Sequence, residues 1–504
     1  MPRTPYYVTT AIAYVNANPH IGFALEVLAG DVLARYHRLR GDEVRFLTGT
    51  DEHGTKVQRA AEKAGVEVQK FADERAARFR DHVRELGATA DVFIRTTDPT
   101  HVRVAQEFWT RANAAGDIYK KKYRGLYCIG CEAFLTESEV SPEGTCCIHG
   151  TKPELTEEEN YFFKLSCYRD WLLKHLDNHP EFVQPVGRYN EIHALVESGL
   201  EDVSISRPVS KLSWGIPVPG DESHVMYVWF DALTNYVTGA GFLANDRDFG
   251  LYWPADVHIV GQDILRFHAA LWPAMLKSAG LELPKQIYSH GFVTNAGKKM
   301  SKSVGNVVDP FKIVADYGLD ATRYYLLAEI PFADGGDFSE TRLAERYNAE
   351  LANGIGNLVA RVLQMTHKFA DGKVPGGDVD AALVEQAQAF FKLYDAALSD
   401  LRFHDALAAL NRLVAEANRF VDREKPWSLG ASSPARLQAV LRTLLHIVYD
   451  VGVHLAPFLP ESGDKILGAF GRTLAEATLE QHRQEPLREG LPVKKLEPLF
   501  PRRK

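Results

Sequence analysis

The sequence has 504 residues, 45% of them hydrophobic and 25% charged, and a formal net charge of −8. This balance is typical of a soluble globular protein, and the length predicts about three domains because one hydrophobic core does not grow to this size. The acidic charge argues against a protein that coats nucleic acid without specificity, which usually needs a basic domain. No stretch is apolar enough for a signal peptide or for the roughly 18 residues of a membrane span.

The chain begins with a pattern that predicts a buried strand, a turn and a helix. Residues 6–14 form an uncharged run rich in strand-forming side chains, and residues 16–19 carry turn chemistry. Apolar side chains at helical spacing follow. His20 and Gly22 fall at the start of this helix, where free N–H groups and the helix dipole favour a phosphate, and where a glycine lets a nucleotide approach the backbone. An ordinary helix start with a surface histidine accounts for these two residues equally well.

A second predicted strand, at residues 44–48, completes a strand, helix and strand unit with short links. This order is typical of a parallel sheet, whose ligands bind at the carboxyl ends of the strands, where Asp51 falls. Helices at residues 55–64 and 68–86 and a strand at residues 92–95 continue the pattern. No dinucleotide fingerprint follows the first strand, which argues against a dehydrogenase, and the phosphate-loop pattern is also missing.

Four of the five cysteines lie within twenty residues of one another. Cys128 and Cys131 form one pair, and Cys146 and His149 form another, each with two residues between its members. Each pair can close a tight turn around one tetrahedral ion, so the spacing predicts a structural zinc site, with unliganded thiols as the alternative. Cys147 has the poorer spacing to His149. Cysteines that are so few and so clustered indicate a reducing cytoplasm rather than a secreted disulfide framework.

A parallel-sheet pattern resumes after this region. Residues 225–229, 257–263 and 286–290 predict strands, and residues 264–277 predict a helix between the last two. A nucleotide-binding fold split by a zinc-bearing insertion is therefore the economical architecture. Beyond about residue 345 the strand patterns vanish, and two apolar stripes at helical spacing predict long helices.

The turn at His20 and a distant Lys-Met-Ser-Lys-Ser loop at residues 299–303 together resemble the two signature sequences of class I aminoacyl-tRNA synthetases. The resemblance runs over residues 6–427 and is to the methionine-specific members in particular. Three further segments carry it, namely residues 11–14, 50–54 and 227–232. The chain departs from the first signature at one position, because Phe23 stands where a second histidine is usual. Gln262 likewise stands where the family normally has lysine.

The resemblance implies an α/β fold in which a Rossmann-like nucleotide-binding domain with a parallel sheet is split by a zinc-bearing insertion and followed by an α-helical bundle that reads the anticodon. The chain then divides into a first catalytic half at 1–118, the insertion with its zinc knuckle at 119–224, a second catalytic half with the lysine loop at 225–345, and the helical anticodon-binding domain at 346–504. The insertion is short beside the editing domains of the isoleucine, leucine and valine relatives.

The activity implied is that of an aminoacyl-tRNA ligase. Such an enzyme converts L-methionine and ATP, with Mg²⁺ accompanying the ATP, to methionyl-adenylate and pyrophosphate, and then passes methionine to the 3′ end of elongator and initiator methionine tRNA. One structural zinc is the second cofactor implied. The chain ends at residue 504 without the extra tRNA-binding domain that some relatives use to dimerise. We therefore expect a monomer, in the cytoplasm and away from membranes.

The resemblance also implies roles for individual residues. The catalytic candidates are His20, Lys299 and Lys302. The ATP-binding candidates are His20, Gly22, Phe23, Gly261, Asp263 and Lys302. The methionine-binding candidates are Ala11, Ile12, Tyr14, Asp51, Trp229, Tyr236, Ile264 and His268. The anticodon candidates are Asn357, Arg361 and Trp427. Without the resemblance, the aromatic members of the methionine set would be interpreted as core packing and the lysines as plain loop residues.

Two other functions fit parts of the pattern. Phe23 motivates a non-catalytic synthetase-like protein that binds tRNA or an amino acid. A ligase for another amino acid, such as leucine, valine or cysteine, is the second alternative, but the short insertion and the intact residues around Asp51, Trp229 and His268 argue against it. Amino-acid-dependent exchange of pyrophosphate into ATP separates the three functions.

Overall fold

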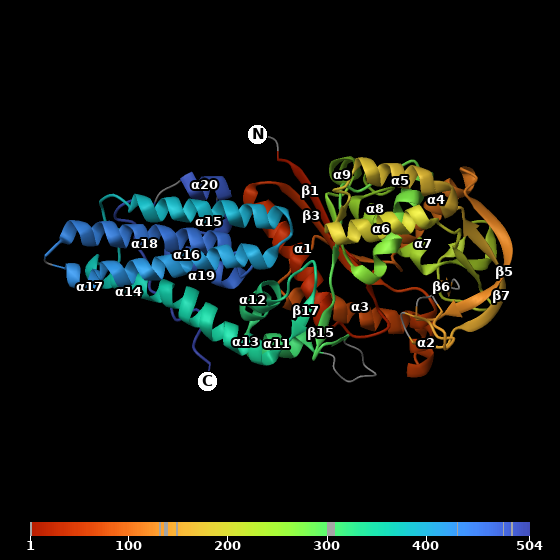
Figure 1. The fold of residues 1–504 in the computed structure, drawn as a ribbon, viewed down its shortest axis with the longest axis horizontal. Helices are drawn as coiled ribbons and strands as arrows, with labels where there is room; N and C mark the ends of the chain where they lie inside the picture. The colour runs from red at the N-terminus through yellow and green to blue at the C-terminus, as the bar shows by residue number, and fades with distance from the viewer. Residues whose placement is uncertain are drawn as a thin grey trace.

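The computed structural model describes residues 3–130, 133–135, 140–147, 150–299, 308–430, 432–476, 478–484 and 487–503. The molecule is elongated, as Figure 1 shows. A parallel sheet lies near its middle, a curved antiparallel hairpin closes one end, and a bundle of long helices forms the other end. Within the described residues, no helix combines the length and the hydropathy that crossing a membrane requires.

A seven-stranded sheet, in which all paired neighbours are parallel, forms the centre of the catalytic half. Its strands are β1 (Pro5–Thr10), β2 (Ala13–Tyr14), β3 (Glu43–Asp51), β4 (Val92–Arg95), β8 (Val183–Gln184), β13 (Val257–Gly261) and β14 (Ile287–His290). β3 pairs with one side of β1 and β13 with the other, so the chain order of the strands reverses at β1. Open parallel sheets bind ligands at the carboxyl ends of their strands at such a point. The predicted parallel-sheet fold is confirmed.

The first predicted strand, over residues 6–14, is interrupted in the structure. β1 and β2 are separated by two residues, and the N–H of the first of them, Ala11, donates to the Ile259 carbonyl at 3.0 Å. The chain then crosses to β3, so that Tyr14 pairs with Asp51. The interruption leads the chain from the middle of the sheet to the end of the neighbouring strand.

Helix α1 (Ile21–Arg40) starts where the sequence predicts. His20 is its N-cap, and the His20 Nδ1 accepts the Gly22 N–H at 3.0 Å. Gly41 ends the helix with a φ of 95°, a left-handed conformation that glycine adopts without strain. The next two helices, α2 (Thr55–Ala64) and α3 (Val68–Glu85), also lie close to their predicted bounds, and α4 (Pro99–Ala114) follows β4.

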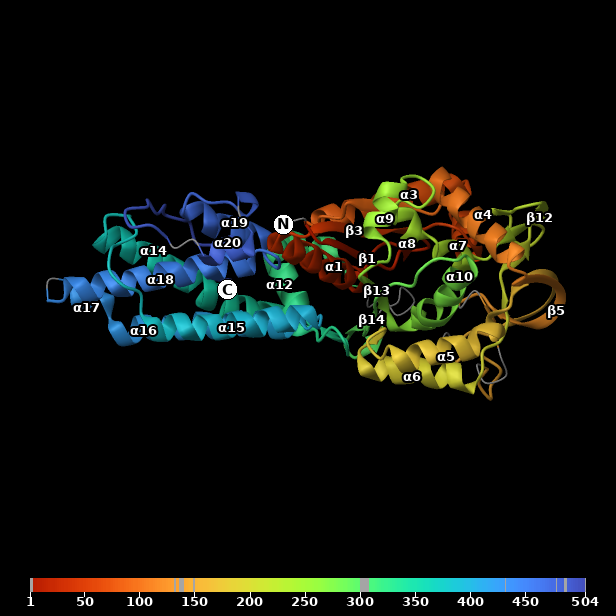
Figure 2. The same ribbon diagram turned by 90° about the horizontal axis from the view of Figure 1, so that it is seen from above.

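The insertion is built on a long antiparallel hairpin. Its elements, apart from β8, are β5 (Ile118–Cys128), β6 (Ala133–Leu135), β7 (Glu154–Phe163), η2 (Leu165–Tyr168), α5 (Arg169–Asn178), α6 (Val186–Ser198), β9 (Val203–Ser204), β10 (Ser206–Pro208) and β11 (Pro217–Val218). β5 and β7 pair over most of their length and form the curved hairpin at the right edge of Figure 1. Figure 2 shows α5 and α6 lying side by side below the rest of this half.

The strand predicted at residues 225–229 does not belong to the parallel sheet, and that prediction is wrong. Its first part lies in β12 (Asp221–Met226), which pairs antiparallel with β10 and β11 in a separate small sheet. Its second part forms the short helix α7 (Val228–Ala232), which carries Trp229. A short apolar run does not distinguish a buried strand from a buried helix, so only the packing of the whole chain decides between them.

The second catalytic half contains short helices and a small three-stranded sheet of β15, β16 and β17. Its elements, apart from the strands of the parallel sheet, are α8 (Asn235–Ala240), α9 (Asp246–Tyr252), η3 (Gln262–Ile264), η4 (Phe267–Leu271), α10 (Trp272–Ser278), β15 (Val293–Asn295), β16 (Lys298–Lys299), α11 (Pro310–Tyr317), α12 (Leu319–Glu329), β17 (Gly336–Phe338) and α13 (Glu340–Arg346). η4 is a single turn of π-helix, a feature frequent at functional sites.

The helical end of the molecule confirms the helical C-terminal region predicted from the apolar stripes. Its elements are η5 (Tyr347–Gly356), α14 (Asn357–Phe369), α15 (Ala381–Ser399), α16 (Phe403–Glu424), α17 (Pro426–Leu429), α18 (Pro434–Leu455), α19 (Pro460–Ala469), η6 (Leu474–Glu476) and α20 (Leu479–Gln484). α15, α16 and α18 run side by side along the long axis (Figure 1), with their apolar faces buried against one another. Among the described residues beyond β17, the only strand-like pairing is an isolated bridge between Lys373 and Pro492.

A fully buried ion pair joins α12 to α1 within the catalytic half, and its arginine also reaches the helical half. Arg323 of α12 donates from Nη2 to the Asp31 Oδ2 of α1 at 2.7 Å, and neither side chain is accessible to water. Its other N–H groups donate to the backbone carbonyls of Leu86, Pro457 and Phe458 at 2.6–3.0 Å. Burial alone would raise the pKa of Asp31, but the charges of the arginines around it outweigh burial and lower that pKa. One guanidinium therefore connects α1, the end of α3 and the segment before α19.

Replacing Arg323 by leucine should destabilise the protein by about 3–5 kcal/mol, because the variant leaves the buried Asp31 carboxylate without its main cation. Urea unfolding followed by circular dichroism measures this loss. The double variant with Asp31→Asn should lose less than the sum of the two single variants, since the two side chains interact directly. Arg402→Leu, which breaks an exposed ion pair in the helical half, should cost about 0–1 kcal/mol. Equal losses for Arg323→Leu and Arg402→Leu would contradict the prediction.

Candidate active site

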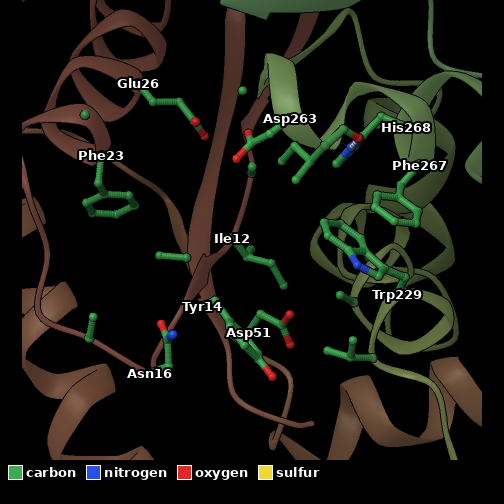
Figure 3. Close-up of a pocket in the computed structure, with 18 of the residues that line it drawn as sticks. Ile12, Tyr14, Asn16, Phe23, Glu26, Asp51, Trp229, Asp263, Phe267 and His268 are labelled. Carbon is green, nitrogen blue, oxygen red and sulfur yellow. Dashed lines mark hydrogen bonds between the residues drawn. The ribbon is translucent and has the colours of Figure 1, made fainter. Parts of the chain in front are cut away.

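A cavity of about 440 Å³ opens at the carboxyl ends of β1, β3, β13 and β14, at the point where the strand order reverses. Figure 3 shows the start of α1 on one side of it and the helices around Trp229 and Phe267 on the other. The lining includes all the methionine candidates, namely Ala11, Ile12, Tyr14, Asp51, Trp229, Tyr236, Ile264 and His268. It also includes the ATP candidates His20, Gly22, Phe23, Gly261 and Asp263. Residues far apart in the sequence thus share one cavity.

Of the two lysine candidates, the structure describes Lys299, while Lys302 lies outside the described residues. Lys299 ends β16, whose partner β15 begins at Val293, itself a residue of the cavity wall. Gln262 does not line the cavity, and its Oε1 instead accepts a hydrogen bond from Arg188 of α6. The side chain that replaces the usual lysine is therefore used for a contact with the insertion.

The start of α1 forms one wall of the cavity. A Cβ at Gly22 would lie 2.9 Å from the His20 ring, so this glycine makes room for the capping imidazole. Gly22 also lines the cavity, so a nucleotide bound there could approach its backbone closely, as the sequence predicts. Phe23 packs edge-on against Phe79 of α3, with ring centroids 5.1 Å apart, and both rings close the wall.

A buried carboxyl and imidazole pair lies above this wall, and sequence reasoning missed it. Glu26 of α1 and His290, the last residue of β14, are joined by a contact of 2.9 Å between Oε2 and Nε2. Burial raises the pKa of Glu26, and the hydrogen bond and charge of Glu26 outweigh burial to raise the pKa of His290. Figure 3 shows Glu26 facing Asp263 across the upper cavity. The available signal was an acidic residue within the apolar stretch of a predicted helix.

The opposite wall is aromatic, and Arg266 lies at its edge with its guanidinium carbon 4.9 Å from the centroid of the Phe267 ring. The Trp229 and Phe267 rings stack with centroids 4.1 Å apart and planes 10° from parallel, as Figure 3 shows. His268 lies edge-on to Trp229, and its Nδ1 is 2.9 Å from the Ile264 carbonyl, which can only accept. Nδ1 therefore carries the proton, and Nε2 accepts from the Tyr236 hydroxyl at 2.7 Å. Burial lowers the pKa of His268 to about 4, so this imidazole is neutral at physiological pH.

Asp51 lies below the aromatic wall. It is the last residue of β3 and is largely buried, and Figure 3 shows its side chain beside Tyr14 at the lower end of the cavity. The wall thus has a carboxylate at one end and stacked aromatic rings beside it. Such a combination suits a molecule with a cationic group and a polarizable apolar chain.

The zinc candidates are partly described. Cys128 and Cys146 are buried together in one small cluster with Leu135 and Val140, while Cys147 is exposed. Cys131 and His149 lie outside the described residues. No group of three or more candidate metal ligands occurs among the residues that are described. The burial of Cys128 and Cys146 in one cluster fits the ligand set predicted from the spacing and its preference for Cys146 over Cys147.

The anticodon candidates lie together on the helical half. Arg361 of α14 pairs with Asp422 at 2.8 Å, and its guanidinium carbon lies 6.0 Å from the centroid of the Trp427 ring. The Asn357 amide, one turn earlier on α14, lies 3.5 Å from the Asn418 side chain. Trp427 is 51% exposed, unusually so for a tryptophan. α17, which carries it, lies at the end of the bundle farthest from the sheet (Figure 1).

Comparison with known proteins places this architecture in a family. The family model described as tRNA synthetases class I (M) matches residues 6–147 and 142–363, and the model described as the anticodon binding domain of methionyl tRNA ligase matches residues 371–502. The chain belongs to the methionine-specific family of class I aminoacyl-tRNA synthetases. The methionine–tRNA ligase of Brucella melitensis is 45% identical, over 100% of this chain and 98% of that protein. That of Mesorhizobium japonicum is 48% identical, over 93% and 91%.

Solved structures of methionyl-tRNA synthetases have the same fold as this chain. The Mycobacterium tuberculosis methionyl-tRNA synthetase in complex with methionyl-adenylate has a TM-score of 0.95 and 43% identity, over 99% of this chain and 100% of that one. The apo form of the same synthetase has a TM-score of 0.88 and 39% identity, over 100% and 99%. By TM-score, the fold of the present chain is therefore closer to that of the complex than to that of the apo form. The family is one of ligases, so the predicted enzyme class is confirmed.

Proposed function

We propose that the protein activates L-methionine with ATP and transfers it to methionine tRNA, elongator and initiator alike. The observation that carries this proposal is the single cavity at the reversal of the parallel sheet. In it, the amino end of α1 faces an aromatic wall that has a carboxylate at its edge (Figure 3). The first wall suits a triphosphate, and the second suits a thioether with an ammonium group.

The aromatic wall is the proposed methionine site. Trp229 and Phe267 offer a flat polarizable surface to the thioether. The neutral His268 adds no charge that would attract an acidic or basic side chain. Asp51 is placed to accept the α-ammonium, and this charge-assisted contact orients the carboxylate of methionine toward the α1 wall. The remaining candidates, Ala11, Ile12, Tyr14, Tyr236 and Ile264, shape the site around the side chain.

The α1 wall is the proposed ATP site. A methionine carboxylate oxygen attacks the α-phosphorus, a new O–P bond forms, and the bond to the pyrophosphate oxygen breaks. This step needs no covalent protein group, so positioning and charge stabilisation must carry it. His20, Lys299 and Lys302 are the proposed phosphate contacts, and Asp263 the proposed partner of the ribose hydroxyls beside Gly261. Mg²⁺ bound with ATP offsets part of the phosphate charge.

Methionine-dependent exchange of pyrophosphate into ATP tests the proposal. The wild type should exchange with methionine and not with leucine, valine or cysteine. His20→Ala and Lys302→Ala should each lower the rate about a hundredfold or more, because each removes a group that stabilises developing phosphate charge. A wild type that binds methionine but exchanges no pyrophosphate would instead support the non-catalytic alternative that Phe23 motivates.

Zinc is proposed as a structural cofactor held by Cys128, Cys131, Cys146 and His149. The shared burial of Cys128 and Cys146 supports this set. A tetrahedral zinc with four protein ligands joins turns that are too short to bury a core of their own, and it has no open position for catalysis. The metal would therefore stabilise the insertion and take no part in the reaction.

Metal analysis of the purified protein should find one zinc per chain. Cys146→Ser should lose the metal because a four-ligand site loses one of its thiolates. Cys147→Ser is the matched control and should keep one zinc, since Cys147 is exposed and lies apart from the buried cluster. Full zinc in Cys146→Ser together with loss in Cys147→Ser would reverse the ligand assignment.

The exposed end of the bundle is the proposed anticodon site. Trp427 offers an exposed ring on which an unpaired base can stack, and Arg361 and Asn357 beside it offer hydrogen-bond donors to base edges. Single-stranded bases are commonly read by this combination of stacking and edge contacts. The site is remote from the cavity (Figure 1), so it acts on tRNA and not on methionine or ATP.

Trp427→Ala should slow tRNA charging about tenfold or more and leave methionine-dependent exchange near normal, because stacking is worth roughly 1–3 kcal/mol per base. Initial rates of aminoacylation and exchange on the same preparation measure the two effects. Leu393→Ala is the control, since Leu393 is also a large exposed apolar residue of the bundle, at 53% exposure, and should change neither rate. Equal losses in both reactions of Trp427→Ala would show that Trp427 serves packing.

The proposed division of the chain follows these roles. Residues 1–118 and 225–345 hold the catalytic domain, 119–224 the insertion and 346–504 the anticodon-binding domain, within which the family match begins at residue 371. Charging of tRNA in a protein with clustered thiols points to the cytoplasm as its place of action. The monomeric state stays a prediction, which sedimentation of the purified protein measures.

A further inference from the structure

His82 of α3 is a buried histidine without a polar partner, and it lies directly behind the cavity wall. Its side chain is 0% exposed, and neither Nδ1 nor Nε2 has a hydrogen-bond partner among the described residues. Burial, and secondarily the charge of His20, lowers its pKa to about 4. A buried polar group without a partner is unfavourable, so an apolar side chain would be the more stable choice here.

The surroundings of His82 belong to the proposed ATP site. Its ring lies 6.0 Å from that of Phe23, and Phe79, one turn earlier on α3, packs edge-on against the same Phe23 ring. Phe23 and Phe79 both line the cavity. On the far side, the His82 ring is 4.9 Å from Phe311, in the first turn of α11. The His82 imidazole therefore packs against Phe23, a ring of the cavity wall that also carries His20.

The wall beside His82 is unusual because of the residue at position 23. Phe23 occupies the position at which the first signature usually has its second histidine. The chain thus has a phenylalanine where an imidazole is expected to face the phosphates, and an imidazole without a partner in the layer behind it. A neutral imidazole still carries one N–H donor, and an arriving polyanion raises the affinity of its second nitrogen for a proton.

We propose that His82 takes the place of the second signature histidine: when the Phe23 ring turns aside, a ring N–H of His82 donates to the phosphates of ATP. The movement required is a side-chain rotation, which is fast on the timescale of catalysis. The same rotation removes the apolar Phe23 ring from the cavity wall and brings the N–H donor of His82 to it. The unfavourable burial of His82 in the free protein is then compensated in the complex with ATP. This role rests on the proposed function and adds a residue to its ATP site.

Kinetics of methionine-dependent pyrophosphate exchange test the role with four proteins, namely wild type, His82→Phe, Phe23→His and the double variant. His82→Phe should lower kcat about a hundredfold, the usual effect of losing one donor to developing charge, with the KM for methionine unchanged. Its thermal midpoint should stay near that of the wild type, because removing an unpartnered polar group offsets the cost of the slightly larger ring. The double variant should recover most of the lost rate, since it restores an imidazole at position 23.

His446→Phe is the matched control. His446 lies in α18 of the helical half, burial also lowers its pKa to about 4, and its Nε2 has no partner among the described residues. Exchange should be unaffected in this variant. A structural role for His82 alone would leave exchange intact, and that result would overturn the role while leaving the proposed function in place.

Two other results would also overturn the role. Loss of exchange in His82→Phe without recovery in the double variant would mean that His82 only supports the packing of Phe23. An equal gain from Phe23→His in the presence and absence of His82 would mean that the two side chains act independently. A wild type without any methionine-dependent exchange would overturn the proposed function itself, and this role with it.

Discussion

Asp31 and Arg323 form an ion pair that water does not reach, and the arrangement of both halves of the molecule depends on it. α1 carries Asp31 in its middle and the phosphate-facing turn at its amino end. Because Arg323 also donates to the carbonyls of Leu86 after α3 and of Phe458 before α19, it ties α1 to α3 and to the bundle at once. A single buried charge is costly, so this pair is stable only when the aspartate, the arginine and the carbonyls that accept from the arginine are all in place.

The fixed α1 determines the character of the cavity. Its amino end makes one wall electropositive, while in the opposite wall burial and the hydrogen bonds to Tyr236 and Ile264 keep His268 neutral. Groups held in place before the substrates arrive stabilise a charged transition state without reorganisation. The anticodon candidates lie at the far end of the bundle, so a tRNA that contacts both proposed sites would extend along the bundle (Figure 1).

Much of this organisation was predictable from the residues. The pattern at 6–38, with its strand, turn and helix, predicts β1 and the start of α1 near His20, because hydrophobic periodicity and turn chemistry are local properties. The candidates for methionine and ATP that the structure describes all line one cavity, as the rule for carboxyl ends of parallel strands leads one to expect. The strand predicted at 225–229 failed, since a short apolar run has no period that separates strand from helix.

The sequence by itself determined the elements, the sheet class, the two signatures and the candidate zinc ligands, because each depends on neighbours in the chain or on spacing. The tertiary structure decided which side chains from distant parts of the sequence are in contact. Glu26 and His290 meet across 264 positions, Trp229 stacks on Phe267 from a different helix, and His82 lies behind Phe23, none of which leaves a local pattern. Burial lowers the pKa of His82 and the contact with Glu26 raises that of His290, and both effects are properties of the packed chain.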